Sequence, residues 1–373
     1  MKIVNFIGTL KKEDGVAQVI LALIQEAKKR NIESMIVTGW AEDLSMTSAP
    51  IVQIPSVVFP LYKEYHLPLP GMRGFEQHVR AFQPDVIHVH SPDTSAWAAV
   101  TYAKKYAIPI VATHHTDFSR DLSYYHLAFL RPLVWQILKN LYSRMGAVTT
   151  PSVVTTDELA HYGIKQLHTI PWGVDFERFN ISFRSQEWRK KILGTKTFNT
   201  QILLCVCRLA WEKDLRTLAQ TYELLRASRN DFAMVVAGDG PARKELERLM
   251  PGAVFLGYLG EKELSQAYAS SDMFLFPSSR ETFGNVTIEA MASGSIPIVA
   301  NAGGSKTIVR DGENGLIAQP QSAKDFYQKT VMLLDDTSLQ EKMRAAGLRD
   351  SKRYAWDHVF EQMLEIYHRL MKI

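Results

Sequence analysis

Short apolar runs alternate with longer amphipathic stretches along most of the chain. Runs such as 3–7, 84–90 and 109–113 each end in a polar loop. Between the first runs, residues 16–30 place apolar side chains at helical spacing and close with three basic residues. This alternation predicts an α/β fold in which helices cover parallel sheets.

The pattern is interrupted once and then restarts. Residues 184–200 are polar and show no strand pattern. We therefore expect an N-terminal Rossmann-like domain over residues 1–174, an interdomain connection over 175–198 and a second Rossmann-like domain over 199–354. Ligands of open parallel sheets bind at the carboxyl ends of the strands, so a cleft between the two domains is expected to hold the ligand.

Composition narrows the class of protein. The 373 residues are 46% hydrophobic and 22% charged, with a formal net charge of +4. The charge is spread over both halves, which argues against a nucleic-acid-binding protein. No apolar run reaches the ~18 residues of a membrane span. The expected location is cytoplasmic, either soluble or peripheral at the inner face of the membrane. Cys205 and Cys207 are expected to be reduced core thiols.

Residues 276–294, FPSSRETFGNVTIEAMASG, carry the strongest functional pattern. An apolar strand leads into a loop with Glu281, and a helix containing Glu289 follows and ends at Gly294. The start of a helix favours an anion because its backbone N–H groups are unpaired. A carboxylate beside it suits a phosphorylated ligand rich in hydroxyls. The alternative is a polar loop that caps an ordinary helix.

Two further loops suggest a diphosphate site. Arg208 ends an apolar run and Lys213 follows in the loop, where the two cations could grip a diphosphate, although loop charges are often only solvated. Gly238 and Gly240 follow another strand and precede a helix. A dinucleotide fingerprint needs a third glycine where this chain has Arg243, so NAD binding is not expected.

Histidines cluster in the first half. His88 and His90 share one expected strand and could form a metal pair, but no third ligand is near in sequence, so packing or hydrogen bonding is preferred. His114 and His115 follow the strand at 109–113, where a functional role is expected.

Residues 127–145 form an unusual amphipathic pattern. An apolar stripe is flanked by Arg131, Trp135 and Lys139, as in a helix that lies at a membrane interface. The alternative is a core helix with a solvated edge. Binding of a membrane or of a lipid acceptor through these residues is therefore one of two open interpretations.

The chain resembles the retaining GT-B glycosyltransferases of family four, and most closely bacterial GDP-mannose-dependent α-mannosyltransferases and sulfoquinovosyl-diacylglycerol synthases. The resemblance extends over nearly the whole length and rests on PDVIHVHSP, IPWGVD, CRLAWEKDL, VVAGDGPARKELE, ETFGNVTIEAMASG and NAGGS. It implies a GT-B fold, with two doubly wound domains facing a central cleft and a C-terminal helix, at about 355–373, that crosses back to the N-terminal domain.

The resemblance also implies roles for the matching residues. Arg208 and Lys213 would bind the donor diphosphate, Glu281 the sugar hydroxyls and Glu289 the ribose, while His115 would lie beside the reacting sugar. The remaining donor-binding positions would be Gly15, Gly238, Gly240, Phe283, Gly284 and Asn285. Asp14 stands where the family often has a second glycine, Cys207 where it has glycine, and His114 where close relatives often have tyrosine.

The function implied is transfer of a hexose from a nucleoside-diphosphate sugar to a hydroxyl, with retained α configuration and without a metal or another cofactor. The base, GDP or UDP, stays open, as does the choice between a lipid or glycolipid acceptor and a soluble glycan or small molecule. Two rivals remain: a glycoside hydrolase using Glu281 and Glu289 as an acid/base pair, and a nucleotide-sugar-binding protein without activity.

Overall fold

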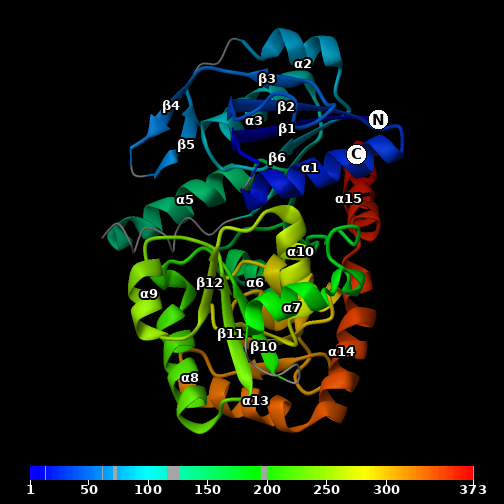
Figure 1. Ribbon diagram of the computed structural model, residues 1–373. Helices are drawn as coiled ribbons and strands as arrows, with labels where there is room; N and C mark the ends of the chain where they lie inside the picture. Colours follow the sequence, from blue (N-terminus) through cyan, green and yellow to red (C-terminus); the bar gives the residue numbers. More distant parts are fainter. Residues whose placement is uncertain (13, 61, 70–73, 116–126, 195–199, 373) are drawn as a thin grey trace. The chain divides into compact units, whose positions relative to one another are not determined.

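The computed structural model describes residues 1–12, 14–60, 62–69, 74–115, 127–194 and 200–372. The chain divides into two compact units, unit 1 with Met1–Trp172 and Trp356–Ile373 and unit 2 with Gly173–Ala355 (Figure 1). Residues 195–198 of the expected connection lie outside the described residues. Residues 116–118, in the loop expected after the strand at 109–113, do so too.

Unit 1 is an α/β unit with a small hairpin. Its strands are β1 (Lys2–Leu10), β2 (Glu33–Ala41), β3 (Ile51–Gln53), β4 (Ser56–Phe59), β5 (Tyr62–Pro68), β6 (Val86–Val89), β7 (Ile110–Thr113), β8 (Ala147–Thr150) and β9 (Leu167–Thr169). Its helices are α1 (Gly15–Lys29), α2 (Glu76–Phe82), α3 (Thr94–Tyr106), the 3₁₀ turn η1 (Ala128–Leu130), α5 (Arg131–Tyr142), α6 (Val153–His161) and α15 (Trp356–Met371).

The main sheet of unit 1 is parallel, in the order β3-β2-β1-β6-β7-β8-β9. Its inner strands are buried along nearly all of their length because helices cover both faces, which explains their mainly apolar composition. Helices α2, α3, α5 and α6 pack on one face. On the other face α1 and α15 lie side by side (Figure 1). The C-terminal helix therefore belongs to the first unit, as the resemblance implied.

Unit 2 repeats the architecture. Its strands are β10 (Gln201–Val206), β11 (Phe232–Ala237), β12 (Val254–Gly257), β13 (Met273–Phe276), β14 (Ile296–Ala300) and β15 (Leu316–Ala318). Its helices are η2 (Ile181–Phe183), α7 (Gln186–Leu193), η3 (Trp211–Lys213), α8 (Leu215–Ser228), α9 (Arg243–Leu249), α10 (Glu261–Ser270), α11 (Asn285–Ala292), α12 (Ser305–Ile308), α13 (Ala323–Asp335), α14 (Thr337–Ser351) and η4 (Lys352–Tyr354).

The sheet of unit 2 is parallel, in the order β12-β11-β10-β13-β14-β15. This is the doubly wound order of a Rossmann fold, with its topological switch point between β10 and β13. Helices α8, α9, α13 and α14 contribute to the core on one face. Both units are therefore Rossmann-like, as predicted.

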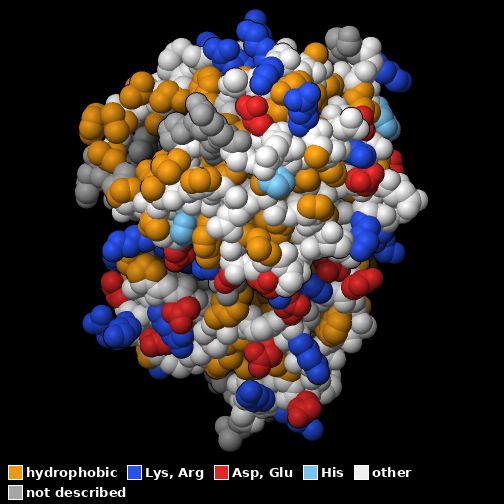
Figure 2. Space-filling model, turned by 90° about the horizontal axis from the view of Figure 1, so that it is seen from above, with side chains coloured by type: hydrophobic (Ala, Val, Ile, Leu, Met, Phe, Trp, Pro, Cys, Tyr) orange, Lys and Arg blue, Asp and Glu red, His pale blue; other side chains and the backbone are white. Residues whose placement is uncertain are grey.

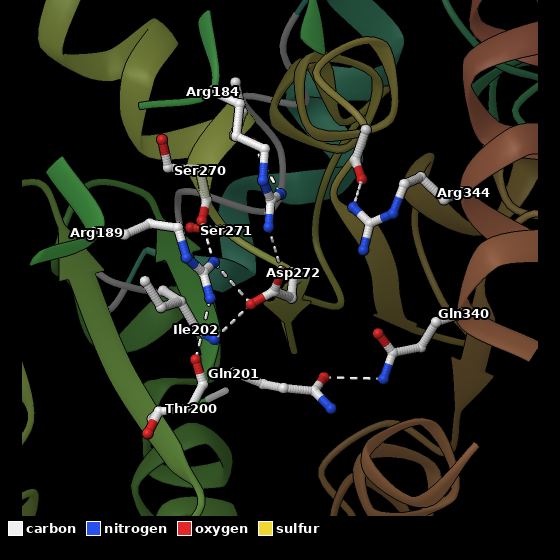
Figure 3. Close-up of polar contacts among 12 residues, drawn as sticks. Arg184, Arg189, Thr200, Gln201, Ile202, Ser270, Ser271, Asp272, Gln340 and Arg344 are labelled. Atoms are coloured by element: carbon white, nitrogen blue, oxygen red, sulfur yellow. Dashed lines mark hydrogen bonds and ion pairs between the residues drawn. The ribbon is translucent and has the colours of Figure 1, made fainter. Parts of the chain in front are cut away.

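The segment expected to be an interdomain connection belongs to unit 2. Ser185 caps α7 by accepting from the Trp188 backbone. Arg189, which is 5% exposed, pairs with Asp272 at 2.9 Å and also donates to the Ser270 carbonyl. Arg184 binds the other oxygen of Asp272 at 2.9 Å, as Figure 3 shows. These two ion pairs, of which the Arg189–Asp272 pair is buried, fasten residues 184–193 to the sheet. The polar composition therefore marks an ion-paired segment of the second unit.

Several predicted boundaries were wrong. Strand β10 ends at Val206, so Cys207 and Arg208 lie in the following loop, and Cys207 is only partly buried whereas Cys205 is fully buried. The helix expected after Gly240, α9, begins at Arg243. The single helix expected over 127–145 is a 3₁₀ turn followed by α5, which carries proline in its first turn.

Surface charge is mixed. On the face shown in Figure 2, acidic and basic side chains are interspersed. In the part of the chain that the structure describes, no helix is long and apolar enough to cross a membrane.

Candidate functional site

The candidate site of unit 2 lies where two adjacent parallel strands end. The loop after β10 carries Arg208 and Lys213, and the loop after β13 carries Glu281. Strands β10 and β13 are neighbours in the sheet but leave it in opposite winding directions. A crevice forms at such a switch point and is the usual ligand position in this class of fold.

Lys213 and Glu281 meet there. The Lys213 ammonium donates to Glu281 Oε1 at 2.7 Å, and the Ser278 hydroxyl donates to the same oxygen at 2.7 Å. The Lys213 and Glu281 side chains are 26% and 16% exposed, so both remain within reach of a ligand. The sequence predicted both residues as site residues but not their ion pair.

The ion pair controls the charge of Lys213. Burial by itself would lower the pKa of this ammonium, but the neighbouring Glu281 carboxylate outweighs it and raises the pKa above its ordinary value. Lys213 therefore stays protonated at neutral pH and offers a fixed positive charge.

The two loops are held together by more than this pair. Asp214 Oδ2 accepts from the backbone N–H of Ser279 at 2.9 Å and from its hydroxyl at 2.6 Å. Gly304 donates its backbone N–H to the Glu281 carbonyl at 2.6 Å. A Cβ on Gly303 would lie 2.8 Å from that carbonyl, so the glycine permits this close approach. Glu281 is thus positioned by loops from three strand ends.

Arg208 is placed differently from Lys213. Its side chain is 62% exposed and its guanidinium lies 4.0 Å from Glu212. The two cations predicted to grip a diphosphate therefore come from one loop, but only Lys213 is held by the site carboxylate. A role for Arg208 stays a prediction.

Gly238 and Gly240 are explained by packing of that loop. Both have positive φ, 120° and 154°. A Cβ on Gly240 would lie 2.5 Å from the Leu209 carbonyl oxygen, and one on Gly238 would overlap the Cys207 carbonyl. The two glycines let the turn after β11 press against the loop that carries Arg208 and Lys213. They support the site whether or not they contact a ligand.

The start of α11 is built as predicted. Gly284 has φ 104° and a Cβ there would overlap the Ser305 hydroxyl, so glycine is required. Asn285 opens the helix. The Phe283 side chain is buried against Tyr354, which leaves only its backbone for the ligand role that the sequence suggested. Helix α11 then ends before Gly294, which has φ 82°.

Glu289 lies within α11 and accepts from the Tyr268 hydroxyl at 2.9 Å. Burial raises the pKa of this carboxyl, while the Tyr268 hydrogen bond and the Arg178 charge act in the opposite direction. Glu289 is therefore a shielded acceptor, distinct from the ion-paired Glu281.

Unit 1 presents a different group of side chains at its strand ends. His115 follows β7, is 4% exposed and stacks on Trp172 with ring centroids 5.4 Å apart. His88 and His90 are buried beside it. His88 binds the Tyr367 hydroxyl and the Thr113 hydroxyl, whereas His90 binds His115 at 3.0 Å. The preferred interpretation of the histidine pair as hydrogen-bonded is confirmed.

Gly15 opens α1, whose N-cap is the Asp14 carboxylate. A Cβ on Gly15 would meet no atom within 4 Å, so packing does not require glycine there. Its predicted role at the donor phosphate stays a prediction.

The predicted interfacial residues of α5 are divided between surface and core. Trp135 is 4% exposed and stacks on Tyr162 with centroids 3.8 Å apart. Trp135 therefore cannot serve as a membrane anchor, contrary to that interpretation. Arg131 and Lys139 line a cavity of about 500 Å³ beside it. The apolar residues that face solvent are Phe129, Leu133 and Ile137.

Among the described residues, no group of three or more His, Cys, Asp or Glu side chains is arranged to hold a metal ion. The chemistry that the site of unit 2 offers is that of a fixed cation, a partly exposed carboxylate and a helix start.

Comparison with known proteins assigns the class. Residues 14–178 match Glycosyltransferase Family 4, and residues 200–336 match the glycosyl transferases group 1 domain. A GDP-mannose-dependent alpha-mannosyltransferase from Corynebacterium glutamicum is 32% identical over 367 residues, covering 96% of this chain and 86% of that protein. The chain belongs to glycosyltransferase family 4 and is a glycosyltransferase.

Other relatives add detail. Sulfoquinovosyl transferase SQD2 from Arabidopsis thaliana is 33% identical, with 80% of this chain and 59% of that protein covered. An alpha-monoglucosyldiacylglycerol synthase from Streptococcus pneumoniae is 26% identical, covering 77% of this chain and 68% of that protein. The crystal structure of Anabaena HepE with UDP has a TM-score of 0.80 at 17% identity, with 99% and 100% of the chains covered. The predicted GT-B fold is confirmed.

Proposed function

We propose that the protein transfers a hexose from a nucleoside-diphosphate sugar to the hydroxyl of a membrane lipid or glycolipid, with retention of the α configuration. The observation that carries the proposal is the Lys213–Glu281–Ser278 contact at the switch point of unit 2, next to the start of α11. The relatives named for mannosyl and glucosyl transfer support a hexose.

Each part of the site has a task in this reaction. The leaving diphosphate gathers negative charge in the transition state, where the Lys213 ammonium and the N–H groups at the start of α11 stabilise it more than in the ground state. Arg208, exposed on the same loop, adds a forked donor when the diphosphate is bound. Glu281 accepts hydrogen bonds from sugar hydroxyls, and Glu289 accepts them from the ribose.

Retention follows from a same-face mechanism. The departing phosphate takes the proton of the acceptor hydroxyl while that oxygen attacks the anomeric carbon from the face that the phosphate leaves. The C–O bond to phosphate breaks as the new glycosidic bond forms, and no protein nucleophile is needed.

A lipid acceptor is supported by α5 and by one relative. Phe129 is 74% exposed and Leu133 57%, and they continue through Ile137 as one apolar stripe. Arg131 and Lys139 lie on the same helix and suit anionic headgroups. One relative is named alpha-monoglucosyldiacylglycerol synthase, and the product in that name is a glycolipid. A soluble glycan acceptor would leave the apolar stripe without a task.

The test begins with thermal shifts against UDP, GDP, ADP and NAD. A ligand at ~100 times its dissociation constant stabilises the folded state by about 2.7 kcal/mol. A shift with UDP or GDP alone names the base. Transfer from the matching nucleotide sugar to lipid acceptors in vesicles is then assayed, and the anomeric configuration of the product is read by NMR.

The matched variants are Glu281→Gln and Glu263→Gln, the second on an exposed position of α10. We expect Glu281→Gln to lose transfer and Glu263→Gln to keep it. Sugar release that needs no nucleotide donor would instead identify a hydrolase. An inverted product, or wild-type turnover in Glu281→Gln, would contradict the proposal.

A further inference from the structure

A chain of hydrogen bonds in unit 1 leads from Asn5 to His115. The Asn5 amide nitrogen donates to the Met35 carbonyl at 3.4 Å, which leaves its Oδ1 as the acceptor facing His90. His90 Nε2 lies 3.0 Å from that oxygen, and His90 Nδ1 lies 3.0 Å from His115 Nε2. The three residues come from β1 and from the loops after β6 and β7.

The amide decides where each proton lies. Since Asn5 Oδ1 can only accept, His90 must carry its proton on Nε2. A neutral imidazole has one donor and one acceptor nitrogen, so His90 Nδ1 is then an acceptor. His115 must donate to it from Nε2, which leaves His115 Nδ1 without a proton.

Burial keeps both rings neutral, as this argument requires. Asn5, His90 and His115 are only 3%, 2% and 4% exposed. Burial lowers the pKa of both histidines well below the ordinary value, and the neighbouring histidines lower it further. His115 Nδ1 is buried and has no hydrogen-bond partner among the described residues.

We propose that Asn5 and His90 are positioning residues that hold His115 in the Nε2–H tautomer, so that its Nδ1 is a hydrogen-bond acceptor beside the end of β7 in unit 1. Held in this way, His115 can receive a proton donor such as a sugar hydroxyl but cannot donate from Nδ1. The functional part of this inference rests on the proposed function, whereas the tautomer itself does not.

This chain of hydrogen bonds, the Asn5–His90–His115 relay, also explains why position 5 is an asparagine. Asn5 lies in the middle of β1, where an apolar side chain would be ordinary, and its backbone is fully paired in the sheet. A serine or threonine hydroxyl could either donate or accept and would leave the tautomer undefined. Because the Asn5 amide nitrogen already donates to the Met35 carbonyl, only its oxygen faces His90, and a single tautomer results.

The direct test reads the proton on His115 by NMR. The protein is labelled with ¹⁵N-histidine, and long-range ¹H–¹⁵N spectra assign protonated and bare ring nitrogens. The His115 signals are identified by their loss in His115→Gln. We expect a proton on Nε2 and a bare Nδ1 in the wild type at neutral pH; a proton on Nδ1 would overturn the proposal. This experiment needs no donor or acceptor, so it separates failure of the tautomer from failure of the proposed function.

Two variants of His90 test the relay. In His90→Asn an amide replaces Nδ1 but loses the contact with Asn5, so that either its oxygen or its nitrogen can face His115, whereas His90→Leu removes both. We expect His90→Asn to give a mixture of the two tautomers and to keep more of kcat/KM than His90→Leu. His90→Leu should lose the single tautomer and lower kcat/KM roughly 10-fold to 100-fold, by analogy with metal-binding histidines that lose the partner that orients them.

The control is His358→Asn, on an exposed position of α15, which should change neither reading. Circular dichroism and the unaltered signals of the other histidines show whether each variant folds. If His90→Leu folds and keeps both the His115 tautomer and kcat/KM, the relay has no positioning role. If activity falls equally in His90→Asn and His90→Leu with the tautomer unchanged in both, the effect is structural and the proposal is wrong.

Discussion

The two units share a sheet architecture but place different chemistry among their polar groups. In unit 1 the network along β1, β6 and β7 consists of imidazoles, hydroxyls and one amide, and burial keeps its histidines uncharged. In unit 2 the loops after β10 and β13 carry the ion pair of Lys213 and Glu281, and Asp272, directly before β13 at the other edge of the sheet, pairs with two arginines. The same fold thus provides fixed charges on one unit and oriented neutral groups on the other.

The difference has a physical cause. A buried ion is tolerated only with a partner and further hydrogen bonds, and Asp272 has both, because it also accepts from the Ile202 backbone at 2.9 Å. Neutral imidazoles need no counter-ion but only correctly placed hydrogen-bond partners. Each ring nitrogen of His88 and His90 has one such partner. Mutation can therefore remove the charges of unit 2 and the hydrogen-bond orientation of unit 1 separately.

The largest effect, on the free energy of unfolding, is expected from breaking the buried ion pair of Asp272 and Arg189 in unit 2. Asp272→Asn leaves Arg189 buried without a counter-ion and should lower the free energy of unfolding by about 3–5 kcal/mol. Urea unfolding at pH 7 measures this loss. Asp231→Asn is the matched control, because its pair with Arg229 is at the surface and should cost under about 1 kcal/mol. Equal losses in the two variants would refute the distinction.

Removal of the site cation should affect catalysis more than folding. Lys213→Met keeps the length of the side chain and deletes its charge, and we expect kcat to fall about 10²–10³-fold, as when one transition-state donor is lost. Lys262→Met, on an exposed position of α10, is the control. The measurement is steady-state kinetics with the nucleotide sugar whose base the thermal-shift test selects. Turnover within twofold of the wild type would exclude Lys213 from the proposed role.

Mild acid should distinguish the units. Burial lowers the pKa of His88 to about 3, so the unfolded chain binds its proton first as the pH falls below about 6.5. Stability is then lost with decreasing pH, by about 1.4 kcal/mol per pH unit for each histidine held neutral. Asp272 has a lowered pKa despite its burial, and its contribution is lost only below its ordinary range.

Hydrogen exchange from pH 6.5 to 5 tests this expectation unit by unit. Peptides from β6 and β7 should lose protection, while those from β10 and β13 should keep it. His88→Gln should reduce the slope in unit 1. A loss of protection that is uniform over both units would show that the histidine network does not set the acid response.

The smallest effect concerns the exposed face of α5. Leu133→Ser should weaken binding to anionic vesicles roughly tenfold, because it removes one side chain from the apolar stripe. The folded state should change by less than about 0.5 kcal/mol. Leu224→Ser on α8 is the control, since Leu224 is also exposed but lies in unit 2. If both variants bind vesicles like the wild type, α5 is not a membrane contact.

The sequence predicted the parts that depend on local pattern. The two α/β units, the loop–helix unit around Glu281 and the presence of site residues after β10 follow from apolar runs and helix signals. Of the two interpretations open for residues 127–145, the membrane-interface one fails at Trp135, because helical spacing gives the angle of a side chain but not the neighbour, Tyr162, that covers it. The assignment of residues 184–193 to a connection failed because their polarity reflects pairing with Asp272, more than 80 positions away.

Contacts between distant positions could not be predicted from local pattern. His88 meets Tyr367 across 279 positions, and Lys213 meets Glu281 across 68. A partial signal existed for the second pair, since both residues follow apolar strands and strand ends of one parallel sheet share an edge. For Asn5 the sequence offers only a single amide inside an apolar run, which does not indicate its partner His90.

The return of α15 to unit 1 sets an order for biosynthesis. Residues 1–172 emerge from the ribosome before residues 173–355, but their α1 face lacks Phe360, Met363 and Tyr367 until α15 is made. Residues 173–355 have all their own strands by then and can fold in the meantime. The first unit to be synthesised is therefore the last to be completed, and a ribosome that stalls before α15 leaves an apolar surface for chaperones to cover.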